Sequence, residues 1–188
     1  MSDDDESRWD ARYAGPQTLA ISGSPFLEAL VPELKPSARV LELAGGLGED
    51  AIWFARHGFE VTLSDVSGVA LEHARAAAAE HGVELTALRI DLERAFPAGP
   101  WDAIHCHHYI DRALFDRYPD ALAPGGVVAL CHPTVTNLER HPRPSRRYLY
   151  EPGEMRTLAV AAGLEVVRFE EGWMENGKHE ARLVARRP

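Results

Sequence analysis

The stretch RVLELAGGLGEDAIWFARHG, residues 39–58, decides the fold of this chain. An apolar run leads into three glycines, Gly45, Gly46 and Gly48, and a helix-forming segment follows at once. A buried strand that turns through glycines into a helix brings the backbone close to a nucleotide-like ligand. The stretch therefore predicts a strand–turn–helix unit with a ligand site at its turn.

The same alternation continues on the C-terminal side of this unit. Strands are predicted over 38–44, 59–65, 83–91, 101–108 and 127–133, and helices over 49–58, 67–82, within 111–126 and over 151–163. Short strands that alternate with helices need crossover connections, which give a parallel sheet with helices on both faces. Residues 134–150 are expected to form a loop, because they combine prolines, turn residues and arginines.

Two further strands are predicted at the C-terminal end, over 164–174 and 178–187. Asn176-Gly177 between them is a hairpin signal, since both residues can take positive φ. The predicted fold class is therefore α/β, with three α/β/α layers and a seven-stranded, mostly parallel sheet whose last strand is antiparallel.

Composition limits the partners of the protein. The 188 residues are 45% hydrophobic, enough for one globular domain, and carry a net charge of −9. An acidic surface repels nucleic acid and anionic lipid, so we expect neither as a partner. The acidic start MSDDDES is unlike a signal peptide, so a cytoplasmic location is expected. Cys106 and Cys131 lie in apolar runs and are expected to be buried, reduced thiols.

The N-terminal 35 residues are expected to differ from the rest. Residues 1–35 are interpreted as an acidic tail and a helical cap over the site, and 36–188 as the ligand-binding domain. Trp9 and Tyr13, four residues apart, would share one face of a short helix. Two roles stay open for them: closing over the ligand, or anchoring the helix on the domain.

The glycine turn fits two classes of ligand. Gly46-x-Gly48-x-x-Ala51 matches the dinucleotide fingerprint, and Asp65 stands where a ribose-binding acid belongs. However, the carboxylates of Glu42, Glu49 and Asp50 would oppose a pyrophosphate and would suit the ammonium and sulfonium of S-adenosylmethionine. Acids are also favoured in a first helical turn by the helix dipole, so the charges tilt the choice without deciding it.

Five motifs in order resemble those of class I S-adenosylmethionine-dependent methyltransferases. They are VLELAGGLG, LSDVS, RIDLE, WDAIHCHHYIDRALF and ALAPGGVVAL, and the resemblance runs from about Trp9 to the C-terminal end. It implies a Rossmann-like methyltransferase fold, with S-adenosylmethionine as donor and S-adenosylhomocysteine as product. The segments WDARYA, YIDRALF and YLYEPGEM are similar to bacterial small-molecule methyltransferases of the tellurite-resistance and thiopurine types.

The resemblance also implies which residues bind the donor. Glu42, Gly45, Gly46 and Gly48 would frame its methionine end, with Ala44 in place of the usual first glycine. Asp65 would bind the ribose hydroxyls. The adenine side would be formed by Val66, Asp91 and Leu92, and His107, Trp9 and Tyr13 would complete the pocket.

The histidine-rich segment HCHHY supplies the catalytic candidates. His105 is expected to be interior, and His107, on the same strand face, to line the donor pocket. His108 and Tyr109 are expected to face the acceptor. His107, His108, Tyr109 and His132 are the candidate catalytic residues, because an oxygen or nitrogen acceptor needs a base, whereas a thiol does not. Two histidines without a third ligand at motif spacing are weak evidence for zinc, so no metal is expected.

Four arginines, Arg140, Arg143, Arg146 and Arg147, form a basic island that fits an anion-binding flap or a solvated loop. The predicted function is methyl transfer from S-adenosylmethionine to a small molecule such as a thiol or a chalcogen oxyanion. The alternatives are an NAD(P)-dependent oxidoreductase and a non-catalytic S-adenosylmethionine-binding protein. The chain is expected to be a monomer or a homodimer.

Overall fold

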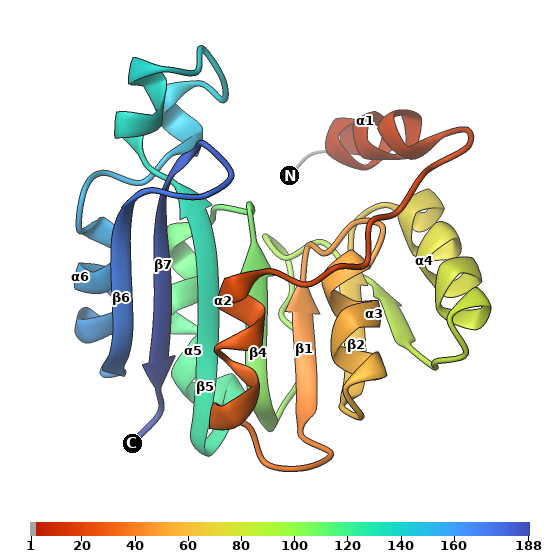
Figure 1. Cartoon of the computed structure of the whole chain (residues 1–188), viewed down its shortest axis with the longest axis horizontal. Helices are drawn as coiled ribbons and strands as arrows, with labels where there is room; N and C mark the ends of the chain where they lie inside the picture. The colour runs from red at the N-terminus through yellow and green to blue at the C-terminus, as the bar shows by residue number, and fades with distance from the viewer. Residues whose placement is uncertain (1–2) are drawn as a thin grey trace.

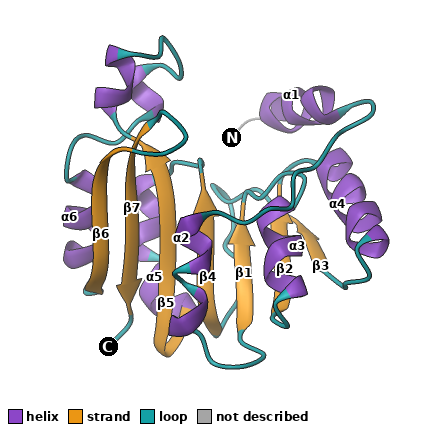
Figure 2. Ribbon diagram, in the orientation of Figure 1, coloured by secondary structure: helices purple, strands orange, loops and turns teal. Residues whose placement is uncertain are grey.

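A computed structural model describes residues 3–188 as one seven-stranded sheet between two layers of helices (Figures 1 and 2). The strand order is β3-β2-β1-β4-β5-β7-β6. The strands are β1 (Arg39–Leu43), β2 (Glu60–Asp65), β3 (Thr86–Arg89), β4 (Trp101–His107), β5 (Leu122–Pro133), β6 (Glu165–Trp173) and β7 (His179–Arg186). β1 to β5 pair in parallel, and β7 is antiparallel to both β5 and β6. The predicted fold class is confirmed.

The helices cover both faces of the sheet. The helices are α1 (Asp3–Tyr13), α2 (Pro25–Glu28), α3 (Glu49–Arg56), α4 (Gly68–Glu80), α5 (Tyr118–Ala121) and α6 (Glu154–Ala161). Residues of α2, α3 and α4 pack on one face of the sheet, and residues of α5 and α6 pack on the other. In Figure 1, α1 lies beyond the carboxyl ends of the strands, next to α4.

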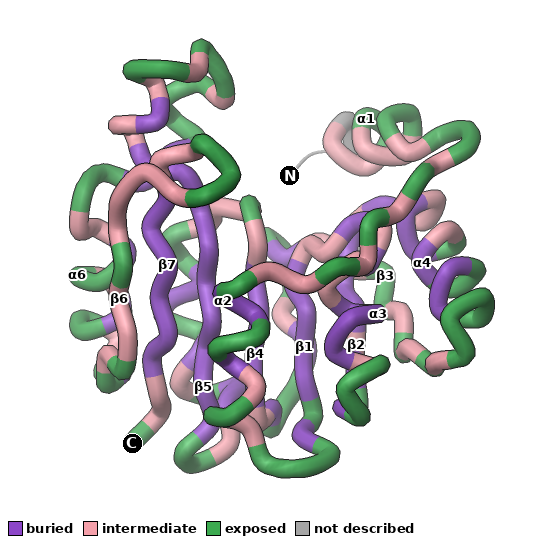
Figure 3. Tube along the Cα trace, viewed as in Figure 1, coloured by how far each residue is buried: buried purple, intermediate pink, exposed green. Residues whose placement is uncertain are grey.

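Each face of the sheet has its own apolar core. Phe54 of α3 and Leu71 of α4 pack with β1 and β2, and Phe115 and Met155 pack with β4, β5 and β7 on the far side. The central strands are buried along most of their length, which Figure 3 shows as continuous purple tubes. Burying a large apolar side chain contributes about 1.5–3 kcal/mol, so these two clusters provide most of the driving force for folding.

Three element boundaries differ from the sequence expectation. β3 is confined to residues 86–89, because it is the edge strand and its pairing with β2 covers only four residues. β5 begins at Leu122, five residues early, and its ALAPGG segment forms an irregular start that opposes only Trp101–Ala103 of β4. The expected helix within 111–126 is a 3-10 helix, Arg112–Asp116, followed by the four-residue α5, with Pro119 in its first turn.

The region expected to be a loop contains short ordered turns. Residues 134–150 form 3-10 helices at Val135–Glu139 and Arg146–Tyr148, and Thr134 bridges to Tyr150. Single 3-10 turns carry no long hydrophobic periodicity, which is why the sequence pattern does not indicate them.

The expected N-terminal cap divides into two parts. Residues of the segment 24–34 enter the core rather than covering the site: Phe26, Leu27 and Leu30 are buried against the sheet. Ser24 caps α2 by accepting a hydrogen bond from the Leu27 N–H at 3.2 Å. α1 and the segment after it lie at the carboxyl edge of the sheet, whereas the segment 24–34 packs against the core.

The C-terminal hairpin turns differently from the expectation. Of Asn176 and Gly177, only Gly177 takes positive φ, at 76°. Asn176 instead uses its side chain: Oδ1 accepts from the Lys178 N–H at 2.9 Å, and Nδ2 donates to Glu180 at 3.1 Å. The turn therefore sets the start of β7 and orients the Glu180 carboxylate as well.

Within residues 3–188, no helix combines the length and the apolar character needed to cross a lipid bilayer.

Helix α1 is held on the domain mainly through Asp10. Its carboxylate accepts from the Ser67 hydroxyl at 2.6 Å and from the Val69 N–H at 3.3 Å, at the start of α4. Glu6 pairs with Arg89, and the Tyr13 carbonyl contacts the His73 ring at 3.1 Å. The hydrogen bond from Ser67 lowers the pKa of Asp10 below its usual 3.8, although partial burial opposes this.

We expect Asp10→Asn to loosen α1 while leaving the rest of the fold unchanged. Because the pKa of Asp10 is lower in the folded state, its contribution is fully present above about pH 3.8 and is lost as the pH falls through the folded-state pKa. At neutral pH, Asp10→Asn imitates this loss. Amide exchange in residues 3–13 should quicken while β1 stays protected, with Asp116→Asn as control. Equal exchange in Asp10→Asn and wild type would show that Asp10 does not hold the helix.

Candidate functional site

A cavity of about 630 Å³ opens at the carboxyl ends of the strands. It lies where the strand order reverses, between β1 and its neighbours β2 and β4, which is the usual ligand position in open α/β sheets. The predicted residues that line it are Trp9, Tyr13, Glu42, Ala44, Gly45, Gly46, Asp65, Val66, Leu92, His107, His108 and Tyr109. The topology thus brings together residues from four strand ends and α1.

The glycine turn leaves no room for side chains. Gly46 has φ of 55° and Gly48 has φ of 74°, both in the left-handed region. A Cβ atom on Gly45 would lie 2.6 Å from the carboxyl group of Glu42, and one on Gly46 would lie 2.6 Å from the Tyr13 hydroxyl. Gly48 itself is the N-cap of α3 and lies outside the cavity lining, so its contribution is to shape the turn.

Ala44 also takes a left-handed conformation, with φ of 50°. For a residue with a side chain this costs about 1–2 kcal/mol, whereas glycine adopts it freely. The resemblance implies a glycine at this position, and the left-handed backbone explains why glycine would be favoured here.

Ala44→Gly is expected to stabilise the fold by about 0.5–1 kcal/mol, because the relieved strain exceeds the entropy that glycine adds to the unfolded chain. Urea unfolding would measure it. The matched control is Ala29→Gly, where φ is −74° and the same change should destabilise. A loss of stability in both variants would mean that Ala44 is unstrained.

Asp65 fixes the turn from the end of β2. Its Oδ2 accepts from the Gly46 N–H and its Oδ1 from the Ser67 N–H, both at 2.8 Å. Burial raises the pKa of this carboxyl, and the two N–H donors oppose that rise only in part. The carboxylate therefore links the turn after β1 to the turn after β2 and faces the cavity with its remaining lone pairs.

Glu42 is a buried acid at the floor of the cavity. Its side chain is 3% exposed, and its Oε2 has no hydrogen-bond partner among the residues described. Burial raises its pKa well above the usual value, and the nearby charges of Asp50 and Asp65 raise it further. A buried acceptor without a partner is costly, so the site fits a ligand that brings a cationic donor.

The two other acids of the turn bind protein groups. Glu49 accepts from the Ala20 N–H at 2.5 Å and so ties down the segment that follows α1. Asp50 Oδ2 lies 3.1 Å from His105 Nε2 and 3.1 Å from His107 Nδ1. Burial alone would raise the pKa of Asp50, but these two histidine contacts outweigh it and the pKa lies well below its usual range.

The histidines of β4 lie differently from the alternation expected of a strand. His105 is interior, as predicted, and His107 lines the cavity. His108 is not on the opposite face, because β4 ends at His107 and His108 has φ of 61°. Its ring therefore lies 4.1 Å from that of His107, centroid to centroid. Tyr109 follows and also lines the cavity, and burial raises its pKa.

Besides Gly48, two predicted residues lie outside the cavity lining, Asp91 and His132. Asp91 bonds to the loop after β3, where its Oδ1 accepts from the Glu93 N–H at 3.0 Å. His132 is buried near the end of β5 against Tyr150, at 5.4 Å between ring centroids. Burial lowers the pKa of His132 to about 3, with His108 and His107 adding to the effect.

The aromatic pair on α1 lies at the cavity. Trp9 and Tyr13 stack at 5.8 Å between centroids, and both line the cavity. Burial raises the pKa of Tyr13, with the charge of Asp65 contributing.

The arginine island lies away from the cavity, and three of its members contact neighbouring side chains. Arg140 stacks on Trp173 at 3.8 Å, Arg147 on Tyr148 at 4.5 Å, and Arg146 pairs with Glu151 at 2.6 Å. These contacts favour a structural role over an anion-binding flap.

The sequence did not indicate several residues of this region. Arg12 lines the cavity because α1 lies at the carboxyl edge, and Ser22 and Gly23 line it because the segment after α1 crosses that edge. Glu180 meets His108 at 2.9 Å from a strand 72 residues away. No local pattern in HEARLVAR, residues 179–186, marks Glu180 as a site residue. Cys106 and Cys131 are both buried and free, as predicted.

Part of the chain matches a known family of domains. Residues 40–126 match the family described as a methyltransferase domain. The ribosomal protein L11 methyltransferase of Thermus thermophilus is 37% identical over 106 residues, covering 55% of this chain and 42% of that protein. The chain therefore spans less than half the length of this curated relative.

Solved structures share the fold. An S-adenosylmethionine-dependent methyltransferase from Mesorhizobium loti aligns with a TM-score of 0.73 at 21% identity, over 89% of this chain and 100% of that one. Another, from Aquifex aeolicus, aligns with a TM-score of 0.71 at 18% identity, over the full length of both. The match over residues 40–126 and the shared fold agree with the five motifs that resemble class I S-adenosylmethionine-dependent methyltransferases.

Proposed function

We propose that the chain transfers a methyl group from S-adenosylmethionine to a small-molecule acceptor. The observation that carries the proposal is the acid-lined cavity, with the unpartnered Glu42 Oε2 at its floor. The ammonium and sulfonium of this donor suit Glu42, Asp50 and Asp65, whereas the pyrophosphate of a dinucleotide would be repelled. When bound, the donor supplies an electrophilic methyl group.

The donor-binding assignments remain those that the resemblance implies. Glu42 would receive the ammonium, the glycine turn would admit the methionine chain, and Asp65 would accept from the ribose hydroxyls. Val66 and Leu92 offer apolar contacts for the adenine, and α1 would cover the site with Trp9 and Tyr13. Asp91 accepts from the Glu93 N–H and pairs with Arg94, and its remaining lone pairs could accept from the adenine amino group.

Asp50 and His107 give the site a means of accepting a proton. The Asp50 carboxylate holds His107 Nδ1 at 3.1 Å, which favours the tautomer with a proton on Nδ1 and leaves Nε2 as a base. An oxygen or nitrogen acceptor would deliver its proton there. A thiol acceptor would need no such base near neutral pH.

A protein acceptor is the second candidate, and the match to the Thermus thermophilus enzyme favours it. The small-molecule proposal is supported by α1, whose Trp9, Arg12 and Tyr13 wall the cavity and narrow the approach of a folded partner. The expected cytoplasmic location and the monomeric or homodimeric state remain predictions.

Calorimetric titration with S-adenosylhomocysteine and with NAD separates the proposed donor from the oxidoreductase alternative. We expect binding of the former only. Metabolite extracts and ribosomal protein fractions would then be incubated with methyl-labelled donor, and the labelled product identified. Label in small molecules supports the proposal, label in protein supports the second candidate, and tight binding without any labelled product supports a non-catalytic binding protein.

A further inference from the structure

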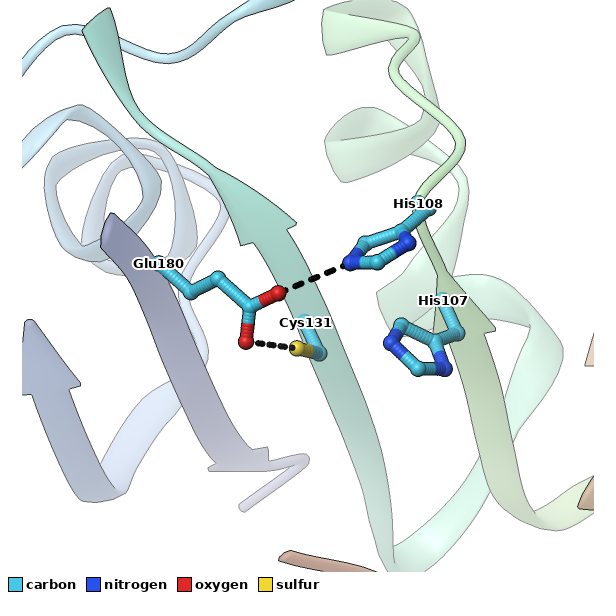
Figure 4. A group of neighbouring side chains, drawn as sticks. All are labelled: His107, His108, Cys131 and Glu180. Atoms are coloured by element: carbon cyan, nitrogen blue, oxygen red, sulfur yellow. Dashed lines mark hydrogen bonds and ion pairs between the residues drawn. The ribbon is translucent and has the colours of Figure 1, made fainter. Parts of the chain in front are cut away.

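Four side chains with metal-ligating atoms meet beside the donor cavity. They are His107 and His108 at the end of β4, Cys131 in β5 and Glu180 at the start of β7. One ligand atom from each lies within 4.8 Å of those of the other three. Figure 4 shows the Cys131 sulfur of β5 between the Glu180 carboxylate of β7 on one side and the two histidine rings at the end of β4 on the other.

The sheet fixes this arrangement. His107 pairs with Cys131 in the parallel β4–β5 register, and Glu180 pairs with Pro133 in the antiparallel β5–β7 register. The left-handed backbone at His108 turns its ring toward the same point. Residues far apart in sequence are thus placed together by rigid strands, which favours a precise site.

Hydrogen bonds connect three of these side chains at the point where a metal ion could bind instead. His108 Nε2 lies 2.9 Å from Glu180 Oε1, and the Cys131 thiol donates to Glu180 Oε2 at 3.4 Å. Two imidazoles, a thiol and a carboxylate are the ligand types of tetrahedral zinc sites. An ion would displace the thiol proton, because a coordinated thiol is deprotonated outright.

The surroundings supply the supporting contacts that metal ligands need. Asp50 holds His107 through Nδ1, and the other ring nitrogen points toward Cys131 and Glu180 (Figure 4). Carboxylate–histidine pairs of this kind orient the ring and raise its basicity as a ligand. Asn176 donates to Glu180 Oε1 at 3.1 Å and fixes that carboxylate in turn.

The charges around the cluster balance. A divalent cation would be matched by the Glu180 carboxylate and the Cys131 thiolate. The nearby Arg182 contacts Glu180 at 3.3 Å, but Glu175 neutralises it at 2.9 Å. Glu180 and Cys131 are buried, and the two histidine side chains are about one third exposed toward the cavity, so an ion has an entry path.

We propose that His107, His108, Cys131 and Glu180 bind one zinc-class divalent ion in the wall of the donor cavity. This binding site goes beyond the proposed methyl transfer and can be tested without any assay of that activity. A bound ion would occupy His107 Nε2, so the metal-bound chain would suit an acceptor such as a thiol, which needs no base at that nitrogen.

The experiment uses the full chain, stripped with a chelator and dialysed to remove it. Titration with zinc chloride should give one ion per chain by calorimetry and elemental analysis. Cobalt(II) loading should give a near-ultraviolet thiolate-to-cobalt band, which Cys131→Ser should abolish. Cys106→Ser is the matched control, because it also removes a buried thiol and should retain the band. His108→Asn, chosen because asparagine tolerates positive φ, should weaken binding at least tenfold.

Asp50→Asn should reduce zinc affinity by about 10–100-fold, as for other supporting carboxylates. Circular dichroism of each variant checks that the fold persists. A wild-type protein that binds less than one ion, or whose cobalt complex lacks the thiolate band, would overturn the site irrespective of how the variants fold. Equal zinc affinity in wild type and Cys131→Ser would show that Cys131 is not a ligand and would overturn the proposed site.

Discussion

Asp65→Asn is expected to reduce S-adenosylhomocysteine affinity by about 100-fold, since each hydrogen bond to a charged group contributes about 1.5–3 kcal/mol. The carboxylate now satisfies two backbone donors, the Gly46 and Ser67 N–H groups, at 2.8 Å each. An amide offers a single oxygen, so one of these buried donors would lose its partner. The turn after β1 would then relax, and the ribose hydroxyls would lose an acceptor.

The matched control for this variant is Asp102→Asn. Asp102 also accepts from a backbone N–H, that of Arg39 at 2.9 Å, and pairs with Lys35 at 2.8 Å. It lies at the amino ends of the strands, remote from the cavity, and its replacement changes the net charge by the same amount. Calorimetry should show unaltered binding for Asp102→Asn. Comparable losses in the two variants would remove Asp65 from the donor site.

Glu42→Gln is expected to stabilise the folded protein while weakening donor binding. Burial raises the pKa of Glu42 well above its usual 4.5, so the folded state holds a proton that the unfolded state releases. Stability therefore falls as the pH rises from about 4.5 through the folded-state pKa. Glutamine does not ionise, so the variant avoids this loss. Its free energy of unfolding should exceed that of wild type by about 2 kcal/mol at pH 8 and should equal it below pH 4.

Donor binding should respond in the opposite direction. An ammonium facing Glu42 favours the ionised carboxylate, so binding to wild type should release a proton, whereas binding to Glu42→Gln should release none. Affinity for S-adenosylhomocysteine should fall by about 10–100-fold. Urea unfolding from pH 4 to 8 and calorimetry in buffers of different ionisation enthalpy measure the two effects. A variant that is less stable than wild type at pH 8, or that binds equally well, would refute this role of Glu42.

The sheet and the donor pocket could be predicted because their signals are local. The spacing of apolar residues indicates β1 to β5 and the helices α3 and α4. The glycines and acids of the pocket come directly after strands in the sequence. Parallel strands place those ends at one edge, so the order of the motifs along the chain was enough to group the residues of the pocket. The short helices at 112–121 could not be predicted because single turns carry no long hydrophobic period. The bulged start of β5 could not be predicted because it depends on a register shift against β4.

The sequence by itself determined the three-layer fold and the grouping of residues around the glycine turn. Only the tertiary structure decided what the histidines of β4 contact. Asp50 joins His105 and His107, a positive φ redirects His108, and the β5–β7 pairing brings in Cys131 and Glu180. The physical reason is that side-chain contacts between strands depend on strand register and on single backbone angles. Neither produces a periodic pattern in the amino-acid sequence.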